Sequence, residues 1–308
     1  MSSTCRVVQA SEVAARFSQE IKAGISEKQV SPLLVGFLAN EDPAAHTYAQ
    51  WTQKACEALG LRFELRVCSR TELEDKVVDA NVDDNVHGIM VYYPVFGGSQ
   101  DQYIQNIVSV QKDVEGLSHT YRYNMYHNIR YLDKEEKVKC IIPCTPLAVI
   151  KILEYVGAYN PIIPYGNRLF GKTITVINRS EVVGRPLAAL MANDGARVFS
   201  VDEFGILEFT RGQGIKLNKH EIKESSVKLE EALSISDVVI TGVPSPNYKM
   251  KTASLKDGVI AINFSTFKNY DQDIQEKASI FVPSVGKVTI AMLQRNLLRC
   301  YDYMQLAK

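Results

Sequence analysis

Short apolar runs alternate along the chain with longer windows in which apolar residues recur at the spacing of an α-helix. The runs are rich in Val, Ile and Leu. Apolar strands that alternate with helices are typical of parallel strands covered by helices on both faces. The pattern therefore predicts an α/β fold, with strands at residues 32–39, 62–67, 88–93, 173–178, 197–202, 237–242 and 258–263.

The length of 308 residues exceeds the usual size of a single domain, so we expect two lobes. A stretch rich in Pro, Gly and Asn at residues 157–172 is typical of a connection, and it precedes the first strand of the second lobe. We expect a first domain at residues 1–150 and a second at residues 151–286. The apolar spacing near the end of the chain predicts a C-terminal helix, within residues 287–308, that returns to the first domain.

The charges are balanced, since Lys and Arg total 35 and Asp and Glu also total 35. No basic surface for nucleic acid is expected, so a nucleic-acid partner is disfavoured. The charged segment at residues 203–231 is longer than an ordinary connection, and we expect a solvated excursion there. The sequence has no apolar leader and no apolar run of membrane-spanning length, which favours a cytoplasmic protein without a membrane partner.

Six cysteines are scattered along the chain without a CxxC pair. This spacing argues against a disulfide framework and against a zinc site. We therefore expect reduced thiols and no bound metal.

Residues 173–202 have the layout of a strand, a tight turn, a helix and a second strand that ends in an acid. In dinucleotide-binding βαβ units the pyrophosphate lies at the N-terminus of that helix. Asn178 and Ser180 occupy the first two glycine positions of the usual fingerprint, and Gly184 falls one residue late. Asn is the residue that best replaces Gly where φ is positive, so the turn is retained. The pattern predicts dinucleotide binding.

Asp202 stands where a carboxylate can accept a hydrogen bond from the adenosine ribose. A carboxylate there repels a 2′-phosphate, which favours NAD over NADP. Arg179 and Arg197 favour the opposite choice, because arginine is the usual partner of phosphate. The alternative for Asp202 is a cap at the end of the strand.

Segments along nearly the whole chain carry the motifs of one enzyme family. NRSEVVGRP, at residues 178–186, resembles the GRSxxVGxP signature of the methylenetetrahydrofolate dehydrogenase/cyclohydrolase family. KDVEGL at residues 112–117 resembles KDVDGL, and GIMVYYPVF resembles GILVQLPLP. IPCTPLAVIKIL and PSVGKVTIAML resemble two further family motifs, and DPAAHTY with ALGL resembles the substrate helix. The resemblance is strongest to the monofunctional, NAD-dependent branch found in yeasts.

The resemblance implies an N-terminal α/β folate-binding lobe and a Rossmann-like nucleotide lobe with a parallel sheet. It implies oxidation of 5,10-methylenetetrahydrofolate to 5,10-methenyltetrahydrofolate with NAD as cofactor. It also implies a homodimer that forms through the nucleotide lobe.

One family feature is absent from this sequence. The family has a Tyr-x-x-x-Lys pair whose lysine serves the cyclohydrolase step, and here Tyr48 is followed by Thr52 at the lysine position. Lys54 lies two residues further along, rotated by roughly 120° on a helix, so it does not easily substitute. Hydride removal needs no proton transfer, whereas hydrolysis does. We therefore expect the dehydrogenase activity to be kept and the cyclohydrolase activity to be lost.

Three further positions depart from the family. Tyr92 replaces a glutamine, Glu115 replaces the aspartate that binds the pterin, and Ala45 replaces a serine. The resemblance implies that Tyr48 stacks on the aminobenzoyl ring and that Cys144 packs rather than reacts. The implied catalytic residues are Tyr48, Glu115 and Thr52, the last in place of the family lysine. The implied substrate-binding residues are Tyr92, Pro94, Pro283 and Gly286. The implied cofactor-binding residues are Thr145, Asn178, Arg179, Ser180, Val183, Gly184, Asp202, Gly242 and Thr289.

Two alternatives remain. The first is a bifunctional NADP-dependent dehydrogenase/cyclohydrolase in which another group replaces the lysine. The second is a catalytically silent NAD- or folate-binding module, which the retained Tyr48 and Thr145 disfavour.

Overall fold

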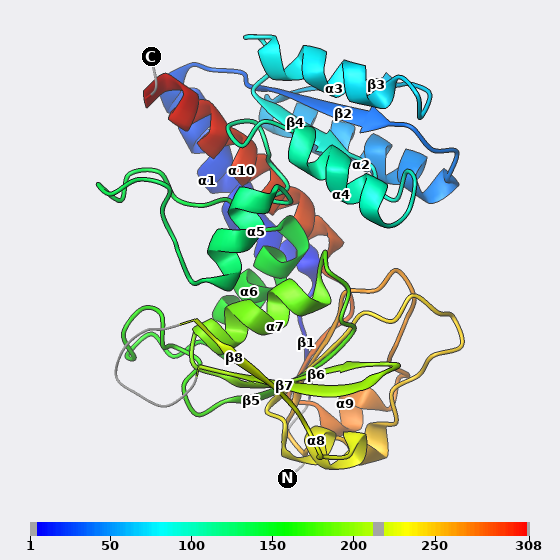
Figure 1. Ribbon diagram of the computed structural model, residues 1–308. Coiled ribbons are helices and arrows are strands. Elements are labelled where there is room, and N and C mark those ends of the chain that lie inside the picture. Colours follow the sequence, from blue (N-terminus) through cyan, green and yellow to red (C-terminus); the bar gives the residue numbers. More distant parts are fainter. Residues whose placement is uncertain (1–4, 212–218, 307–308) are drawn as a thin grey trace. The chain divides into compact units, whose positions relative to one another are not determined.

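The computed structural model describes residues 5–211 and 219–306 (Figure 1). The chain forms two compact units, which we name by their sheets. The large-sheet unit comprises Met1–Ala14, Asn124–Ile129 and Thr145–Thr289, and the small-sheet unit comprises Ala15–Tyr123, Arg130–Cys144 and Ile290–Lys308.

Within the described residues, the large-sheet unit has an eight-stranded sheet. Six strands at one side are parallel to one another, and the last two at the other side are antiparallel to their neighbours. The spatial order is β1 (Arg6–Val7), β11 (Ile280–Val282), β10 (Ile260–Asn263), β9 (Val238–Thr241), β5 (Thr173–Ile177), β6 (Arg197–Asp202), β7 (Gly205–Thr210) and β8 (Glu221–Glu224).

Helices cover both faces of this sheet, which explains why its central strands β5, β9 and β10 are mostly apolar and buried along nearly their whole length. Figure 1 shows α6 (Cys144–Tyr155) and α7 (Gly184–Asn193) on one side, and α8 (Leu229–Ile235) and α9 (Ile274–Lys277) on the other. Leu233 of α8 packs in one cluster with Val239 of β9 and Ala261 of β10. A short 3₁₀ helix, Thr252–Ser254, lies between β9 and β10 in the sequence.

The small-sheet unit has a parallel sheet in the order β3 (Arg62–Val67), β2 (Leu33–Leu38) and β4 (Gly88–Val91), counted over the described residues. Side chains alternate along β2, so Leu33, Val35 and Phe37 face one side, where they pack with α3 (Leu73–Val82) and α4 (Ser99–Ile107). Leu34 and Leu38 face the other side, where they pack with α1 (Ala10–Lys28), α2 (Pro43–Leu59) and α10 (Gly286–Leu306). The remaining helix is α5 (His119–Tyr126).

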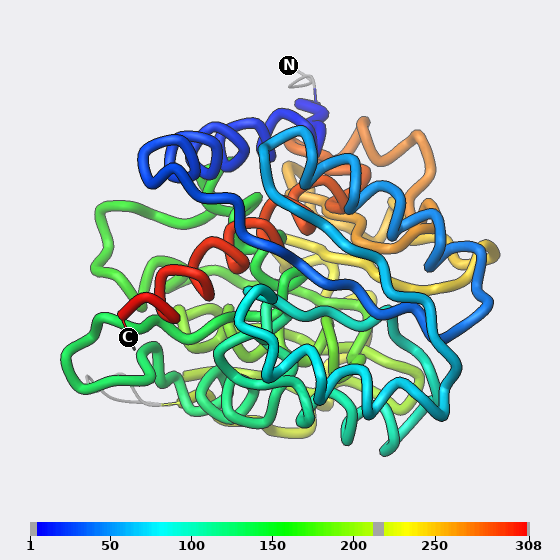
Figure 2. Tube along the Cα trace, turned by 90° about the horizontal axis from the view of Figure 1, so that it is seen from above, coloured from blue at the N-terminus to red at the C-terminus, as the bar shows by residue number. Residues whose placement is uncertain are grey.

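The C-terminal helix packs in the small-sheet unit from Ile290 onward, as predicted. Leu293 and Leu297 of α10 join Ile21 and Ile25 of α1 in one apolar cluster. Figures 1 and 2 show α10, in red, beside α1, in blue.

All seven predicted runs contain strands, and these strands pair in parallel with one another wherever they are neighbours. The α/β class is thereby confirmed. The pattern missed β1 and β11, which have only two and three residues. Runs this short give no periodic signal.

The expectation of a solvated excursion at residues 203–231 is wrong for most of its described part. Within this segment β7 pairs with β6, and β8 pairs with β7. Phe209 of β7 is fully buried. The expectation rested on the charge of the whole segment and overlooked β7, in which Glu208 is the single charged residue and Phe209 packs into the core. Residues 212–218 of the segment lie outside the described residues.

The two units divide the chain differently from the predicted domains, because the large-sheet unit also includes residues before the predicted boundary at 150, among them the N-terminal strand β1. The Arg6 N–H donates to the Ser279 carbonyl and the Val8 N–H to the Phe281 carbonyl, both at 2.9 Å, which adds β1 to the large sheet. Asn124–Ile129 and the residues from Thr145 onward also belong to the large-sheet unit. Over the described residues, no helix is both long and apolar enough to cross a membrane.

Candidate active site

Helix α2 carries the first group of candidate residues, and its sequence explains where it begins and ends. The Asp42 carboxylate accepts a hydrogen bond from the Ala44 N–H at 2.9 Å, and Pro43 occupies the first turn. Gly60 ends the helix at a φ of 85°, which favours glycine. The helix therefore begins at Pro43, directly after its cap Asp42.

Tyr48 and Thr52 lie one turn apart on the inner face of α2. The Thr52 side chain is fully buried, and its hydroxyl donates to the Tyr48 carbonyl oxygen at 2.9 Å. Lys54 is exposed. Thr52 and Lys54 therefore face in different directions, as the helical spacing predicted.

The Tyr48 ring meets the Tyr92 ring edge to face, with 6.1 Å between ring centres and 80° between ring planes. Tyr92 follows β4 and is 5% exposed. Burial raises the pKa of both phenols, and the neighbouring Thr52 hydroxyl only partly offsets this for the pKa of Tyr92. Both tyrosines stay neutral at physiological pH, so they supply aromatic walls rather than bases.

Glu115 lies beside this aromatic pair. Its carboxylate accepts a hydrogen bond from the Val91 N–H at 3.1 Å. Burial raises the pKa of Glu115 to about 8, and the nearby Asp113 adds to the shift. A carboxyl with this pKa is mostly protonated at neutral pH in the absence of a ligand.

The loop that presents Glu115 is held by its neighbours. Asp113 accepts hydrogen bonds from the N–H groups of Gly116 and Ser118, each at 2.8 Å. Gly116 has a φ of 67°, and a Cβ there would lie 2.9 Å from the Ile142 carbonyl carbon, so only glycine fits.

Cys144 and Pro94 complete the candidates of the small-sheet unit. The Cys144 thiol donates to the Val114 carbonyl at 3.4 Å, and Cys144 packs against the apolar core. Burial raises the pKa of this thiol, which agrees with packing rather than nucleophilic reactivity. Pro94 is exposed, and its carbonyl accepts a hydrogen bond from the Asn40 amide at 3.1 Å.

The turn between β5 and α7 carries the predicted nucleotide residues. Asn178 has a φ of 155°, positive as expected but close to extended backbone. Its side chain accepts from the Ser180 N–H and donates to the Gly242 carbonyl, both at 2.9 Å. The Ser180 hydroxyl accepts from the Val183 N–H at 3.2 Å at the start of α7.

Gly184 begins α7 and approaches this turn closely. A Cβ at Gly184 would lie 1.8 Å from the Asn178 carbonyl oxygen, so a side chain is excluded. The missing Cβ lets the first turn of α7 lie against the end of β5, the arrangement that binds a pyrophosphate. The residues present therefore fit a dinucleotide.

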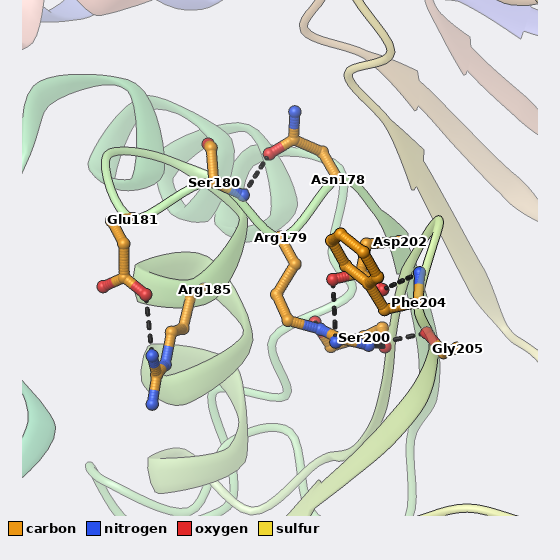
Figure 3. A network of polar contacts seen from close by, with 9 residues as sticks. All are labelled: Asn178, Arg179, Ser180, Glu181, Arg185, Ser200, Asp202, Phe204 and Gly205. Carbon is orange, nitrogen blue, oxygen red and sulfur yellow. Dashed lines mark hydrogen bonds and ion pairs between the residues drawn. The ribbon is translucent and has the colours of Figure 1, made fainter. Parts of the chain in front are cut away.

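Arg179 and Asp202 form an ion pair with 2.8 Å between the Arg179 Nη1 and an Asp202 oxygen (Figure 3). The other Asp202 oxygen accepts from the Phe204 N–H at 2.8 Å. Arg197, the second arginine considered for phosphate, instead pairs with Glu208 of β7 at 2.8 Å. Phe204, two residues after Asp202, was not among the predicted site residues.

The remaining predicted residues lie elsewhere in the large-sheet unit. A Cβ at Gly242 would lie 1.9 Å from the Phe264 ring, so this glycine is needed for packing. Gly286 is exposed, and a Cβ there would meet nothing within 4 Å. The Pro283 carbonyl accepts from the Asn263 amide at 3.1 Å. Thr289 is buried, with its hydroxyl 3.4 Å from the Val285 carbonyl, and Thr145 is half-buried in the first turn of α6.

The two groups define a class of protein: a two-unit α/β enzyme with a dinucleotide-type turn in one unit and, in the other, an aromatic pair beside a carboxyl whose pKa is raised by burial. Residues 8–115 match the family described as tetrahydrofolate dehydrogenase/cyclohydrolase, catalytic domain, and residues 143–212 match the NAD(P)-binding domain of that family. The chain belongs to the tetrahydrofolate dehydrogenase/cyclohydrolase family.

Two yeast proteins are similar to this chain over nearly its full length. The chain is 56% identical over 301 residues to methylenetetrahydrofolate dehydrogenase (NAD+) of Schizosaccharomyces pombe, with 97% of this chain and 94% of that protein covered. It is 55% identical over 318 residues to the Saccharomyces cerevisiae protein of the same name, with 100% and 99% covered. The solved structure of the NAD-dependent 5,10-methylenetetrahydrofolate dehydrogenase from S. cerevisiae matches with a TM-score of 0.93, at 54% identity and 99% coverage of both chains.

Proposed function

We propose that the chain oxidises 5,10-methylenetetrahydrofolate to 5,10-methenyltetrahydrofolate with NAD, and that it does not hydrolyse the product. Family membership and the names of the two yeast relatives support the oxidation and the cofactor. The absence of hydrolysis is inferred from one observation: Thr52 is buried, and its hydroxyl donates a hydrogen bond to the Tyr48 carbonyl.

The oxidation makes few chemical demands on the protein. Bound NAD would supply the acceptor for a hydride from the methylene carbon, and the two flanking nitrogens of the folate would share the resulting positive charge. No proton needs to move, so the main task of the enzyme is to orient the folate. Tyr48 would stack on the aminobenzoyl ring, and Tyr92 would form the adjoining wall.

Glu115 would hold the pterin through its amino and ring N–H groups. In the free protein its carboxyl is mostly protonated at neutral pH, because burial raises its pKa to about 8. N–H donors of the pterin would favour the ionised form, since a carboxylate accepts two hydrogen bonds. Folate binding is therefore expected to release a proton from Glu115.

Hydrolysis of the methenyl product makes different demands. Water must attack the carbon, and protons must be transferred, which calls for an acid or base of suitable pKa. At the family lysine position this chain has the Thr52 hydroxyl, which already donates to the main chain. The neighbouring phenols of Tyr48 and Tyr92 have raised pKa values, so neither replaces an amine as a base.

The β5–α7 turn would bind the pyrophosphate of NAD, and Asp202 would accept a hydrogen bond from the adenosine ribose. The ion pair with Arg179 supports this choice over NADP, because it occupies an arginine that would otherwise attract a 2′-phosphate. Arg197 is likewise engaged, by Glu208.

A rate assay with 5,10-methylenetetrahydrofolate and each cofactor in turn tests the proposal. We expect rapid reduction of NAD, slow reduction of NADP, and decay of added methenyltetrahydrofolate at the rate in buffer alone. Enzymatic acceleration of that decay would favour the bifunctional alternative. Absence of any NAD reduction would reject the dehydrogenase assignment.

We also propose a homodimer in the cytoplasm. The resemblance to the family supports association through the nucleotide-binding unit, and β8, the last strand of the large sheet, exposes all four of its residues. Light scattering of the purified protein measures its mass, and a monomeric mass would contradict the dimer. Imaging of a tagged chain tests the location.

A further inference from the structure

The turn between β6 and β7 is tied to the β5–α7 turn by one side chain, that of Arg179. Its Nη2 donates to the carbonyl oxygens of Ser200 and Gly205, at 2.7 and 2.6 Å. Its Nε lies 3.3 Å from the Ser200 hydroxyl, and its Nη1 pairs with Asp202 at 2.8 Å. All three guanidinium nitrogens are thus engaged, and the side chain is 14% exposed. Figure 3 shows this arrangement, which we call the Arg179 clamp.

The clamp makes the β6–β7 turn short and well defined. Asp202 pairs directly with Gly205 across the hairpin, so only Glu203 and Phe204 form the loop. Gly205 has a φ of 132°, a value that disfavours other residues. The Asp202 carboxylate also accepts the Phe204 N–H, which fixes the backbone at the tip.

Phe204 is the residue that this loop displays. The residue is 87% exposed, although the two phenylalanines in the strands of the hairpin, Phe199 and Phe209, are fully buried. A single exposed apolar residue is common on protein surfaces and by itself indicates nothing. Here, however, Phe204 comes two residues after Asp202, on a loop that is held by the Arg179–Asp202 ion pair, the bond from Arg179 to the Gly205 carbonyl and the bond from the Phe204 N–H to Asp202 (Figure 3).

The position of Phe204 relates it to one part of the cofactor. In dinucleotide-binding units the acid at the end of the second strand binds the adenosine ribose. The adenine is bonded to that ribose, so it must lie close to the residues that follow the acid. Aromatic side chains stack on bases without needing matched hydrogen bonds.

We propose that Phe204 stacks on the adenine of NAD, and that Arg179 is a positioning residue that holds Phe204 and Asp202 in place. The proposal rests on the use of NAD proposed above. Arg179 then acts through the turn and does not bind phosphate. This reverses the role that an arginine at this point of a nucleotide site would ordinarily have.

Phe204→Ala tests the stacking. We expect the KM for NAD, and the inhibition constant of AMP as a competitor, to rise about tenfold, which corresponds to about 1.4 kcal/mol. Phe204→Trp should restore both values, since its ring also stacks. Inhibition by nicotinamide mononucleotide should not change, because that molecule has no adenine. Phe170→Ala is a matched control, since Phe170 is 66% exposed in the same unit but far along the chain from Asp202.

Arg179→Ala tests the positioning role. Loss of the clamp should raise the KM for NAD by a larger factor than it lowers kcat. Phe204→Ala should then raise the KM for NAD much less in the Arg179→Ala background than in the wild type. Full additivity of the two changes would overturn the positioning role. An unchanged NAD KM and AMP inhibition in Phe204→Ala would overturn the stacking.

A failure of the proposed use of NAD can be told apart from a failure of the stacking proposal. If the chain does not use NAD, the wild type itself fails to reduce it, whereas a failed stacking proposal leaves the wild type active and Phe204→Ala equal to it. Thermal unfolding of each variant identifies any loss that comes from misfolding. The Phe204 variants carry the test even if Arg179→Ala does not fold.

Discussion

The Thr52 hydroxyl donates a hydrogen bond to the carbonyl oxygen of Tyr48, one helical turn earlier, at 2.9 Å. Thr52 is fully buried, and its hydrogen bond turns the hydroxyl toward the helix backbone. The position that corresponds to the lysine of the family motif is thus occupied by a group that already has a partner.

Thr52→Lys is expected to restore little or no hydrolysis of methenyltetrahydrofolate. A lysine at this buried site would have a lowered pKa, and Tyr92 and Ala45 replace the family glutamine and serine that would accompany it. The triple variant Thr52→Lys, Tyr92→Gln, Ala45→Ser should hydrolyse the compound measurably above the buffer rate. The decay of the absorbance of methenyltetrahydrofolate measures hydrolysis by the single and the triple variant. Lys54→Ala, at an exposed position on the same helix, should behave as the wild type.

Full hydrolytic activity in the Thr52→Lys single variant would show that the neighbours are dispensable. Hydrolysis by the wild type would reject the account altogether.

Glu115 is expected to make folate use depend on pH. If the pterin needs the carboxylate, kcat/KM for the folate should rise with pH up to about 8 and then level off, because the pKa of Glu115 in the free protein is about 8. Glu115→Gln should lose this dependence, with a folate KM raised roughly tenfold and an NAD KM nearly unchanged. A flat wild-type profile between pH 6 and 9 would contradict the prediction.

The same group should affect stability. The Glu115 carboxyl has a pKa raised from 4.5 to about 8, so above pH 4.5 the unfolded chain releases its proton before the folded one. The free energy of unfolding should therefore fall as pH rises from 4.5 to 8 and level off beyond that. Glu115→Gln should remove this part of the slope and raise the Tm at pH 8. Denaturation at a series of pH values measures the difference, and parallel curves for the two proteins would exclude it.

Asp202→Ser is expected to shift the cofactor preference. Removal of the carboxylate eliminates repulsion of a 2′-phosphate and loosens the Arg179 clamp, so kcat/KM with NADP should rise relative to NAD by about tenfold or more. Glu208→Gln is the matched control, because it weakens another ion pair of the same hairpin, that with Arg197. An unchanged ratio in Asp202→Ser would mean that Asp202 only caps the strand.

Replacement by alanine should destabilise the protein at Gly184 and leave its stability unchanged at Gly286. In Gly184→Ala the new Cβ would collide with the Asn178 carbonyl, so the turn must shift, and we expect a loss of stability of about 2 kcal/mol or more together with weaker NAD binding. In Gly286→Ala the Cβ enters open space, so the Tm should stay within a degree or two of the wild type. Calorimetry of both variants decides, and a Gly184→Ala protein as stable as the wild type would contradict the proposed close approach.

The local pattern was enough to locate the central strands of this chain and its C-terminal helix. Strands such as β2 and β9 are buried on both faces, so their apolar runs stand out from the amphipathic helices around them. The outward direction of Lys54 followed from helix geometry alone. Family motifs indicated the candidate residues, because motif spacing is a property of the sequence.

Other features depended on contacts between residues distant in the chain, which no local pattern records. β1 joins the large sheet only because β11, more than 270 residues later, offers a free edge. The hairpin strands β7 and β8 exist because Phe209 finds a core to enter, despite charged neighbours. The raised pKa of Glu115 comes from burial, and the Arg179–Asp202 pair from two strands meeting side by side. The sequence by itself determined which chemical groups are available, and the tertiary structure decided which of them are buried, charged or already bound, because these properties depend on neighbours in space.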